Sequence, residues 1–334
     1  MIESVLSSLF TLENLLWINV GLAGGIMVGA LPGLTGTMAM ALLLPLTYGL
    51  ASIPGVMLLL GVYCGSIYGG SITAILINTP GTPASAATSL DGYPMAQKGH
   101  GLRALHDALS ASTIGGLFSC AVLLFAAPPI ASFALKFGPA EYFALALFGL
   151  TIIASVGGKS QIKGLLMGFV GLLISCIGID PMDGVSRFTF GINRMEGGID
   201  TIPVLIGLFA VSEMLQQCET GMHASYSKDD TLEVKNNVKF SLLHDFKGQI
   251  INVFRSALLG TFMGILPGVG GSAASLIAYS QAKSWSKHPE LLGTGVPEGL
   301  IASESSNNGL TGGALVPLLS LGIPGDSTTA VLIG

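Results

Sequence analysis

Runs of predominantly apolar residues, separated by short polar stretches, form the pattern of this chain. In a helix that rises about 1.5 Å per residue, runs of this length cross all or part of a hydrocarbon core about 30 Å thick. The pattern therefore predicts an all-α polytopic membrane protein. The expected membrane segments are 15–31, 36–50, 54–77, 104–127, 139–156, 161–179, 200–218, 249–266, 272–282 and 310–323. Polar connections are expected at 78–103, 180–199, 219–248 and 283–299, and Pro128-Pro129 should end or kink the fourth segment.

Composition strengthens this prediction, because 10% of the 334 residues are charged and 50% are hydrophobic. A soluble domain carries about 25% charged residues. The interval from Asn14 to Leu90 contains no Asp, Glu, Lys or Arg. The mean hydropathy of +0.71 points the same way. These values exclude an ordinary soluble domain and make the lipid bilayer the expected surroundings.

A ladder of glycines that ends in a Pro-Gly pair occurs twice. With a constant shift of 235 positions, the matching pairs are Gly25/Gly260, Gly29/Gly264, Pro32/Pro267, Gly33/Gly268 and Gly36/Gly271. With a shift of 244, a second set matches Gly65/Gly309, Gly69/Gly313, Pro80/Pro324 and Gly81/Gly325. Interrupted helices persist in a membrane only where protein or a water-filled cavity surrounds them. Paired interruptions in two halves therefore predict a secondary transporter built from discontinuous helices and hairpins.

Lysines near the ends of apolar runs predict the orientation, since short cytoplasmic loops are enriched in Lys and Arg. Lys159 and Lys163 mark one cytoplasmic turn, whereas the acidic loop 180–200 suits the outside. Counting spans back places the N-terminus in the periplasm and makes the repeat inverted. We expect a first transmembrane repeat at 1–220, a cytoplasmic connecting loop at 221–248 and the start of a second repeat at 249–334. A complete second repeat would reach about residue 480, so the sequence looks truncated within its second half.

The helix breaks are the strongest candidates for a substrate site. A half-helix that starts after a break presents free N–H groups and a positive dipole end, both of which favour an anion. One pair of segments comprises Asn78, Thr79, Pro80, Gly81 and Thr82 with Pro324, Gly325 and Ser327. The other pair comprises Gly33, Thr35 and Gly36 with Gly268, Gly270, Gly271 and Ser272. The alternatives are an ordinary surface loop for the first pair and re-entrant tips that touch no ligand for the second.

Polar side chains near apolar segments are candidates for coupling to a cation, because an intramembrane carboxylate is rarely without function. We expect Asp326, Glu304, Asn307 and Asn308 to be such candidates, with Na⁺ or H⁺ as the coupling ion. Asp107, Glu213 and Arg255 lie close to predicted segment ends, where exposure or snorkelling is expected.

Other kinds of chemistry find no support in the sequence. The four cysteines have no C-x-x-C spacing and the histidines form no paired-ligand motif, so no metal site, no cofactor and no catalytic residues are predicted. Gly158-Lys159-Ser160 is similar to a P-loop, but Ile153 occupies the position of its required glycine. There is no basic patch, and we expect no nucleic-acid partner.

Several stretches together resemble a known family. They are Gly29-Ala-Leu-Pro32-Gly33-Leu-Thr-Gly36; the block from Tyr68-Gly69-Gly70-Ser71-Ile72 through Asn78-Thr79-Pro80-Gly81-Thr82-Pro83 to Asp91-Gly92-Tyr93-Pro94; and, in the second half, Gly264-Ile-Leu-Pro267-Gly268 with Glu304, Asn307-Asn308 and Pro324-Gly325. These residues resemble the large membrane subunit of tripartite tricarboxylate transporters, the TctA type. That subunit is longer than this chain.

The resemblance implies a multi-pass importer in the bacterial inner membrane, driven by an ion gradient and carrying citrate or another small di- or tricarboxylate. Its implied partners are a small four-helix membrane subunit and a periplasmic solute-binding protein. By analogy, an elevator-type motion of one bundle against a scaffold would suit inverted hairpins. Two other classes stay open: an uncoupled anion channel, and an intramembrane enzyme such as an aspartyl protease, which would need two facing carboxylates.

Overall fold

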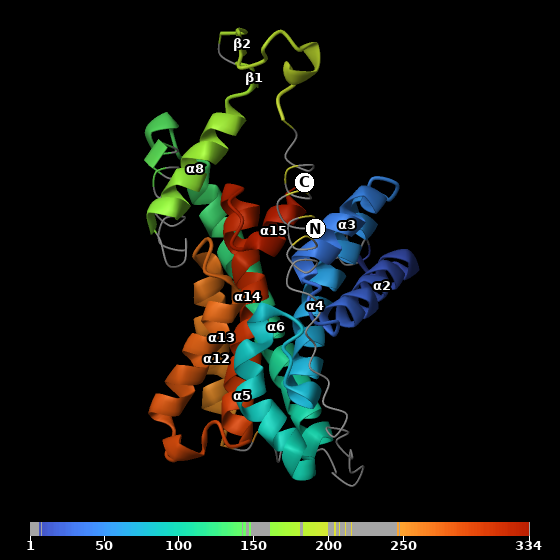
Figure 1. Ribbon diagram of the computed structural model, residues 1–334, viewed down its shortest axis with the longest axis vertical. Helices are drawn as coiled ribbons and strands as arrows, with labels where there is room; N and C mark the ends of the chain where they lie inside the picture. The colour runs from blue at the N-terminus through green and yellow to red at the C-terminus, as the bar shows by residue number, and fades with distance from the viewer. Residues whose placement is uncertain are drawn as a thin grey trace.

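The computed structural model describes residues 9–141, 161–180, 183–199 and 248–333, together with a few isolated positions. The described part is mostly helical. The longer helices are α2 (Leu12–Gly29), α3 (Gly36–Thr47), α4 (Ser52–Ile77), α5 (Ala86–Met95), α6 (Gly101–Ala134), α8 (Gln161–Ser175), α12 (Ile250–Ile265), α13 (Gly270–Trp285), α14 (Pro297–Leu321) and the short α15 (Ser327–Leu332). In Figure 1, α2, α3 and α4 lie on one side of the bundle and α12 and α13 on the other, with α6 and α14 between them.

All four predicted helix breaks are confirmed. The chain is interrupted around Pro32, between α2 and α3, and around Pro267, between α12 and α13. It is also interrupted around Pro80, after α4, and around Pro324, between α14 and α15. The helix-ending residues are equivalent in the two halves, since Asn78 (φ 53°) and Gly322 (φ 72°) are both left-handed C-caps and lie 244 positions apart.

The glycine ladders hold helices together in direct backbone contact. A Cβ atom on Gly25 or Gly29 of α2 would overlap the backbone of Val62 or Ser66 of α4. In the second half, a Cβ atom on Gly260 or Gly264 of α12 would overlap the backbone of α14 in the same way, at Ser306 and Leu310. The pairs α2–α4 and α12–α14 therefore make equivalent contacts at the shifts read from the sequence. Such close approach is how helices associate where water provides no hydrophobic force between them.

Two expectations about segment boundaries were wrong. The connection 78–103 is largely helical: a 3₁₀ turn (Pro83–Ser85), α5 and a π-helical turn (Ala96–His100) lead directly into α6. Helix α14 begins at Pro297, 13 residues before the predicted segment at 310, so its polar Glu304–Asn308 stretch is helical. Helix α6 continues through Pro128 and Pro129 rather than ending there. The apolar pattern did not reveal α5 and the first part of α14, because these segments contain polar residues. Their polar side chains face other protein segments instead of lipid.

The predicted external loop at 180–199 contains a feature that an all-α prediction omits. Strands β1 (Gly178–Ile179) and β2 (Ser186–Arg187) pair antiparallel, with Gly178 opposite Arg187, and a 3₁₀ turn follows at Asn193–Met195. Arg187 forms ion pairs with Asp180 and Asp183. This small sheet projects beyond the helices at the top of Figure 1. The predicted segments 139–156 and 200–218 and the connecting loop 221–248 lie almost wholly outside the described residues.

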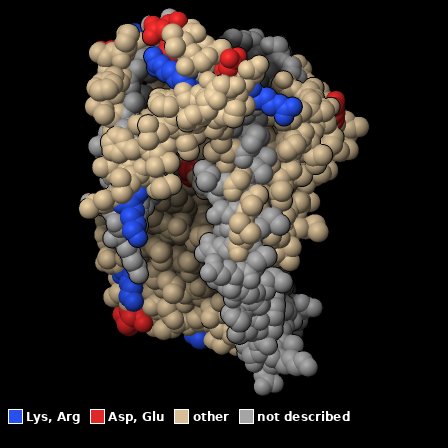
Figure 2. Space-filling model, turned by 45° about the horizontal axis from the view of Figure 1, so that its top comes forward, with Lys and Arg blue, Asp and Glu red and all other residues tan. Residues whose placement is uncertain are grey.

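Length and surface character fit a membrane. Among the described residues, three helical segments are long and apolar enough to cross a bilayer: Leu12–Gly29, Ser52–Ile77 and Pro83–Phe133. Many large apolar side chains are exposed, including Met27, Leu117, Leu124 and Phe125, each at least 68% accessible. On the face seen in Figure 2, charged side chains lie near the top and along the left and lower edges, and most of the remaining described surface is uncharged.

Candidate functional site

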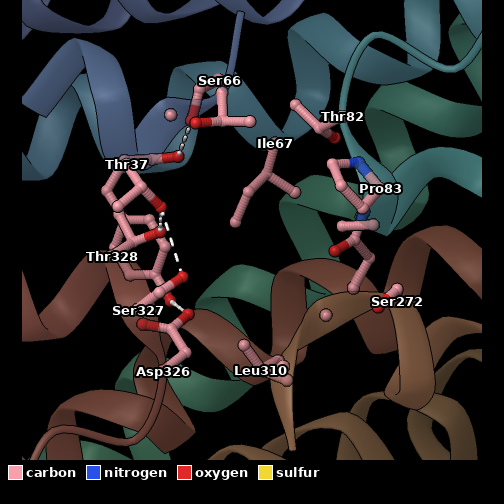
Figure 3. A pocket seen from close by; sticks show the side chains of 17 residues that line it. Thr37, Ser66, Ile67, Thr82, Pro83, Ser272, Leu310, Asp326, Ser327 and Thr328 are labelled. Carbon is pink, nitrogen blue, oxygen red and sulfur yellow. Dashed lines mark hydrogen bonds between the residues drawn. The ribbon is translucent and has the colours of Figure 1, made fainter. Parts of the chain in front are cut away.

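The four helix breaks meet around one cavity of about 270 Å³ in the middle of the described bundle. Figure 3 shows its two walls, with Thr37, Asp326, Ser327 and Thr328 on one side and Thr82, Pro83 and Ser272 facing them across the opening. The complete lining is Thr35, Gly36, Thr37, Tyr63, Ser66, Ile67, Thr82, Pro83, Ala84, Gly270, Gly271, Ser272, Asn307, Leu310, Asp326, Ser327 and Thr328.

Two long helices begin at this cavity. Helix α3 starts at Gly36 after the N-cap Thr35, whose hydroxyl accepts a hydrogen bond from the N–H of Met38. Helix α13 starts at Gly270, and no side chain caps its first turn. The N-terminus of a helix carries a partial positive charge and N–H groups without helical partners. The cavity therefore receives positive potential from both halves of the chain.

Hydroxyl groups form a continuous polar wall. Thr37 Oγ1 lies 2.8 Å from Thr328 Oγ1 and 3.3 Å from Ser327 Oγ, which joins α3 to α15. The Tyr63 hydroxyl donates a 2.6 Å hydrogen bond to Asp326 Oδ2. Hydroxyl groups can act as donors or acceptors, so this wall can bind an anion directly or share an oxygen with a cation.

Among the described residues of the lining, Asp326 is the one carboxylate and there is no Lys or Arg. It is the N-cap of α15, where its Oδ1 accepts hydrogen bonds from the N–H of Thr329 (2.7 Å) and from the Thr329 hydroxyl (2.8 Å). This capping arrangement fixes the carboxylate in place and leaves the charge at the edge of the cavity.

Asn307 is the lining residue whose polar groups most clearly lack a protein partner. Its side chain is fully buried, and neither the amide nitrogen nor the amide oxygen has a hydrogen-bond partner among the described residues. A buried amide without partners costs roughly 1–3 kcal/mol. A ligand in the cavity would relieve that cost by accepting from Nδ2 or donating to Oδ1.

Residues that line the cavity also occupy equivalent positions in the two halves of the chain. Shifted by 235, Thr35, Gly36 and Thr37 correspond to Gly270, Gly271 and Ser272, and all six line the cavity. Shifted by 244, Thr82, Pro83 and Ala84 correspond to Asp326, Ser327 and Thr328, and Tyr63 corresponds to Asn307. The two halves thus contribute equivalent backbone positions with different side chains.

The predicted substrate residues fall into two groups. Those that line the cavity are Thr35, Gly36, Thr82, Gly270, Gly271, Ser272 and Ser327, joined by the ion-coupling candidates Asn307 and Asp326. Those that lie outside it are Gly33, Asn78, Thr79, Pro80, Gly81, Gly268, Pro324, Gly325, Asn308 and Glu304. Several of the second group shape the breaks; Gly81, for example, packs against Gly70 and donates its N–H to the Gly70 carbonyl over 3.1 Å.

Residues that the sequence reasoning missed include Thr37, Tyr63, Ser66 and Thr328. The repeat shifts contain the signal for two of them, because Thr37 and Tyr63 are equivalent to the predicted residues Ser272 and Asn307, whereas Thr328 is equivalent to Ala84, which was not predicted. Ser66 has no such signal, since its counterpart Leu310 is an ordinary apolar residue.

One expectation about the charged residues near segment ends was wrong. Asp107 was expected near a segment end with exposure, but it is fully buried and lies 3.7 Å from Arg103 Nε. Arg255 is half-buried, with its guanidinium 4.6 Å from the ring centre of Trp285. Glu213 lies outside the described residues. Short-range packing of neighbouring helices, which no linear pattern encodes, accounts for the burial of Asp107.

Residues 15–334 match the model of the tripartite tricarboxylate transporter TctA family. This chain belongs to that family. It is 41% identical over 322 residues to an uncharacterised 52.8 kDa protein of the TAR-I ttuC′ 3′ region of Agrobacterium vitis, which covers 96% of this chain and 63% of that protein. A protein of the TAR-II ttuC′ 3′ region of the same organism is 41% identical over 75 residues, or 22% of this chain and 31% of that protein.

This TctA-family chain therefore spans less than two thirds of the length of its long relative. No solved structure matches it significantly.

Proposed function

We propose that the full-length protein is an ion-gradient-driven importer of a small di- or tricarboxylate across the bacterial inner membrane. One observation carries the proposal: breaks from both halves of the chain meet around a polar cavity that two helix N-termini face. In this proposal a periplasmic binding protein delivers the substrate, and a small four-helix membrane subunit completes the transporter. Membership of a tripartite family supports both partners.

The chemistry of the lining favours a carboxylate of modest size. Free N–H groups at the starts of α3 and α13, with the hydroxyls of Thr37, Thr82 and Ser272, supply donors. The unpartnered amide of Asn307 adds one more. The cavity volume of about 270 Å³ is near the lower end of the range for small-molecule sites. Since no Lys or Arg is found in the part of the lining that the structure describes, dipoles and neutral donors would bind the anion there.

Asp326 would repel an anion unless a cation lay between them. We propose that its carboxylate takes part in binding the coupling cation, either directly or through the Tyr63 hydroxyl that it holds. Of the other candidates, Asn307 lies in the cavity, and Asn308 donates to the Glu304 carbonyl within α14. A cation bound together with the substrate would reduce the net negative charge that crosses the membrane.

The direction of α4 relative to α14 supports an inverted repeat. Tyr63 of α4 contacts Asp326, beyond the end of α14, whereas Ser71, further along α4, contacts Glu304 near its start. Contacts that run in opposite directions along the two helices are those of antiparallel elements. Equivalent helices that run in opposite directions are characteristic of alternating-access carriers. An elevator-type motion is the form of alternating access that we propose.

The test is uptake by the full-length protein reconstituted with its partner subunits. Labelled citrate and smaller dicarboxylates would be offered under an imposed Na⁺ gradient, an H⁺ gradient and no gradient. We expect accumulation above equilibrium under one gradient. Uptake that both gradients leave unchanged would reject ion coupling, and failure of every carboxylate offered would reject the substrate class.

The two other classes make different predictions in the same preparation. An uncoupled anion channel would pass single-channel currents and never accumulate solute. An intramembrane aspartyl protease would need a second carboxylate opposite Asp326, and the described lining of the cavity contains no second one.

A further inference from the structure

A second polar centre lies deeper in the bundle, outside the cavity. Glu304 of α14 is fully buried, and three hydroxyl groups from three other helices surround its carboxylate. Ser71 of α4 donates to Oε1 over 2.6 Å, Thr88 of α5 contacts the same oxygen, and Ser112 of α6 donates to Oε2 over 2.8 Å. The carboxyl group thus connects four helices from the two halves of the chain.

No positive charge from the described part of the chain balances this carboxyl group. Among the described residues, none of the ion pairs formed involves Glu304. An unpaired ionised carboxylate is costly inside a membrane protein. Three neutral donors reduce that cost without removing it. Uptake of a proton or of a small cation would remove the charge.

A chain of hydroxyl groups connects Glu304 with the cavity. Thr82 lines the cavity, and its Oγ1 lies 3.0 Å from Ser85 Oγ. Ser85 Oγ is 3.3 Å from Ser71 Oγ, and Ser71 Oγ is 2.6 Å from Glu304 Oε1. All four side chains are buried, so the path is shielded from bulk water.

The packing around the path depends on a glycine. A Cβ atom on Gly70 would overlap Thr82 Oγ1 and approach Ser85 Oγ to 2.6 Å. The Gly70 carbonyl also accepts the N–H of Gly81 over 3.1 Å, which holds the segment that carries Thr82 against α4. Any larger residue at position 70 would therefore separate the hydroxyls from one another.

We propose that Glu304 is the proton-binding group of the transporter and that Thr82, Ser85 and Ser71 conduct the proton between it and the cavity. A proton that reaches Thr82 from the cavity displaces that residue's own hydroxyl proton to Ser85. Ser85 then passes one to Ser71, and Ser71 passes one to Glu304. The carboxylate becomes a neutral carboxylic acid, each hydroxyl ends with one proton, and one positive charge has entered. This inference rests on the proposed ion-driven transport and identifies H⁺ as a coupling ion, bound at Glu304 apart from the cation proposed beside Asp326.

The geometry at Ser71 fits such a relay. Its hydroxyl lies within hydrogen-bond distance of both Ser85 and Glu304, yet it carries one hydrogen. In a relay, the Ser71 hydroxyl donates to Glu304 before the proton is transferred and to Ser85 afterwards. A Na⁺ site would instead need the hydroxyl oxygens to face a central ion, whereas here they donate directly to the carboxylate.

The other titratable groups on the helices around Glu304 interact with other partners or are weak acids. Tyr68 of α4 interacts with it electrostatically. On α5, Asp91 binds Tyr279 of α13 and the loop before α14. On α6, Asp107 lies beside Arg103 and near His106, and on α12 Arg255 binds Asn252 and stacks on Trp285.

The test is infrared difference spectroscopy of the full-length protein in liposomes, without any substrate. Lowering the pH should produce the C=O stretch of a buried carboxylic acid, and Glu304→Gln should remove it. After a change to D₂O, this band should shift quickly in the native protein and about tenfold or more slowly in Ser71→Ala and Ser85→Ala. Ser303→Ala is the matched control, because Ser303 is equally buried on α14 and bonds only the Leu300 carbonyl.

Each outcome decides the proposal. A band that persists in Glu304→Gln, or that never appears at any pH, would overturn the assignment of the proton. Exchange at the native rate in both serine variants would overturn the relay, and loss of the band on adding Na⁺ would show a Na⁺ site instead. Should Glu304→Gln not fold, ¹³C-labelled glutamate in the native protein assigns the band to Glu by its isotope shift. Because no substrate is used, these results are independent of the uptake assay.

Discussion

The hydroxyl of Tyr63 donates a 2.6 Å hydrogen bond to the carboxylate of Asp326, two residues that lie 263 positions apart in the sequence. Tyr63 lies in the middle of α4, and Asp326 caps the first turn of α15. The bond therefore ties the break after α14 to an uninterrupted helix of the other half. Both residues line the cavity.

Tyr63→Phe should lower both the free energy of unfolding and the uptake of substrate. The ring keeps its packing, but the carboxylate loses one donor, which is worth about 1.5–3 kcal/mol for a charged acceptor. Thermal unfolding and uptake of the full-length protein measure the two effects. Tyr48→Phe is the control, because Tyr48 is exposed at the end of α3 and lies outside the cavity. Equal behaviour of the two variants would contradict a role for the Tyr63–Asp326 bond.

Asn307→Leu should abolish uptake without lowering thermal stability. The Asn307 amide has no partner among the described residues, so an apolar side chain of similar size removes an unsatisfied buried group. Binding of substrate should weaken by about tenfold or more, which corresponds to about 1.4 kcal/mol. Asn252→Leu is the contrasting variant, since the Asn252 amide bonds Gln249 and the Glu298 carbonyl and should be needed for stability. A marked loss of stability in Asn307→Leu would indicate protein partners for this amide.

Gly25→Ala should destabilise the protein, whereas Gly24→Ala, one position earlier on the same helix, should not. A Cβ atom at Gly25 meets the backbone of Val62, and at Gly24 it meets no atom within 4 Å. Overpacking of this kind costs about 1–3 kcal/mol, because neither helix can give way without losing other contacts. Thermal unfolding in detergent compares the two variants directly. Similar melting temperatures would argue against tight α2–α4 contact in solution.

Gly325→Val should abolish transport while the protein still inserts into the membrane. A side chain there would overlap Ala314 and the Gly264 carbonyl, and so would push the break out of position. Gly81→Val should behave alike, because Gly81 meets Gly29 and Gly70 in the equivalent place. Gly322→Asn is the control: Asn78 already occupies the equivalent left-handed position in the first half. Normal uptake in both valine variants would disprove that the breaks shape the site.

Asp91→Asn should loosen the loop that precedes α14. The Asp91 carboxylate accepts hydrogen bonds from the N–H groups of Gly293, Gly295 and Val296 and from the Tyr279 hydroxyl. An amide accepts through one oxygen only, and its NH₂ group would face other hydrogen-bond donors. The stabilisation of the loop should therefore fall by about 1.5–3 kcal/mol. Hydrogen exchange of the loop amides measures the effect. Glu290→Gln, whose carboxylate is exposed, should leave the exchange of these amides unchanged.

The helix breaks and the equivalence of the two halves could be predicted from the sequence, because Pro-Gly pairs disfavour a continuous helix and recur at constant shifts. Pro32 and Pro267 are each followed by a glycine, whereas Pro128 and Pro129 lie inside α6 without one. The boundaries of α5 and α14 could not be predicted, because hydropathy assumes that membrane helices face lipid. The polar residues of α14 face other helices instead, as the three hydroxyl partners of Glu304 illustrate.

The amino-acid sequence by itself determined the class, the four breaks and the equivalence of the two halves, since these follow from backbone chemistry and from spacing. Only the tertiary structure decided which residues share the cavity and which are sealed away from it. Thr37, Thr328 and Asp326 meet from segments nearly 300 positions apart, and the path from Thr82 to Glu304 exists only where four helices pack. Contacts of that kind depend on the relative placement of helices, which no linear pattern specifies.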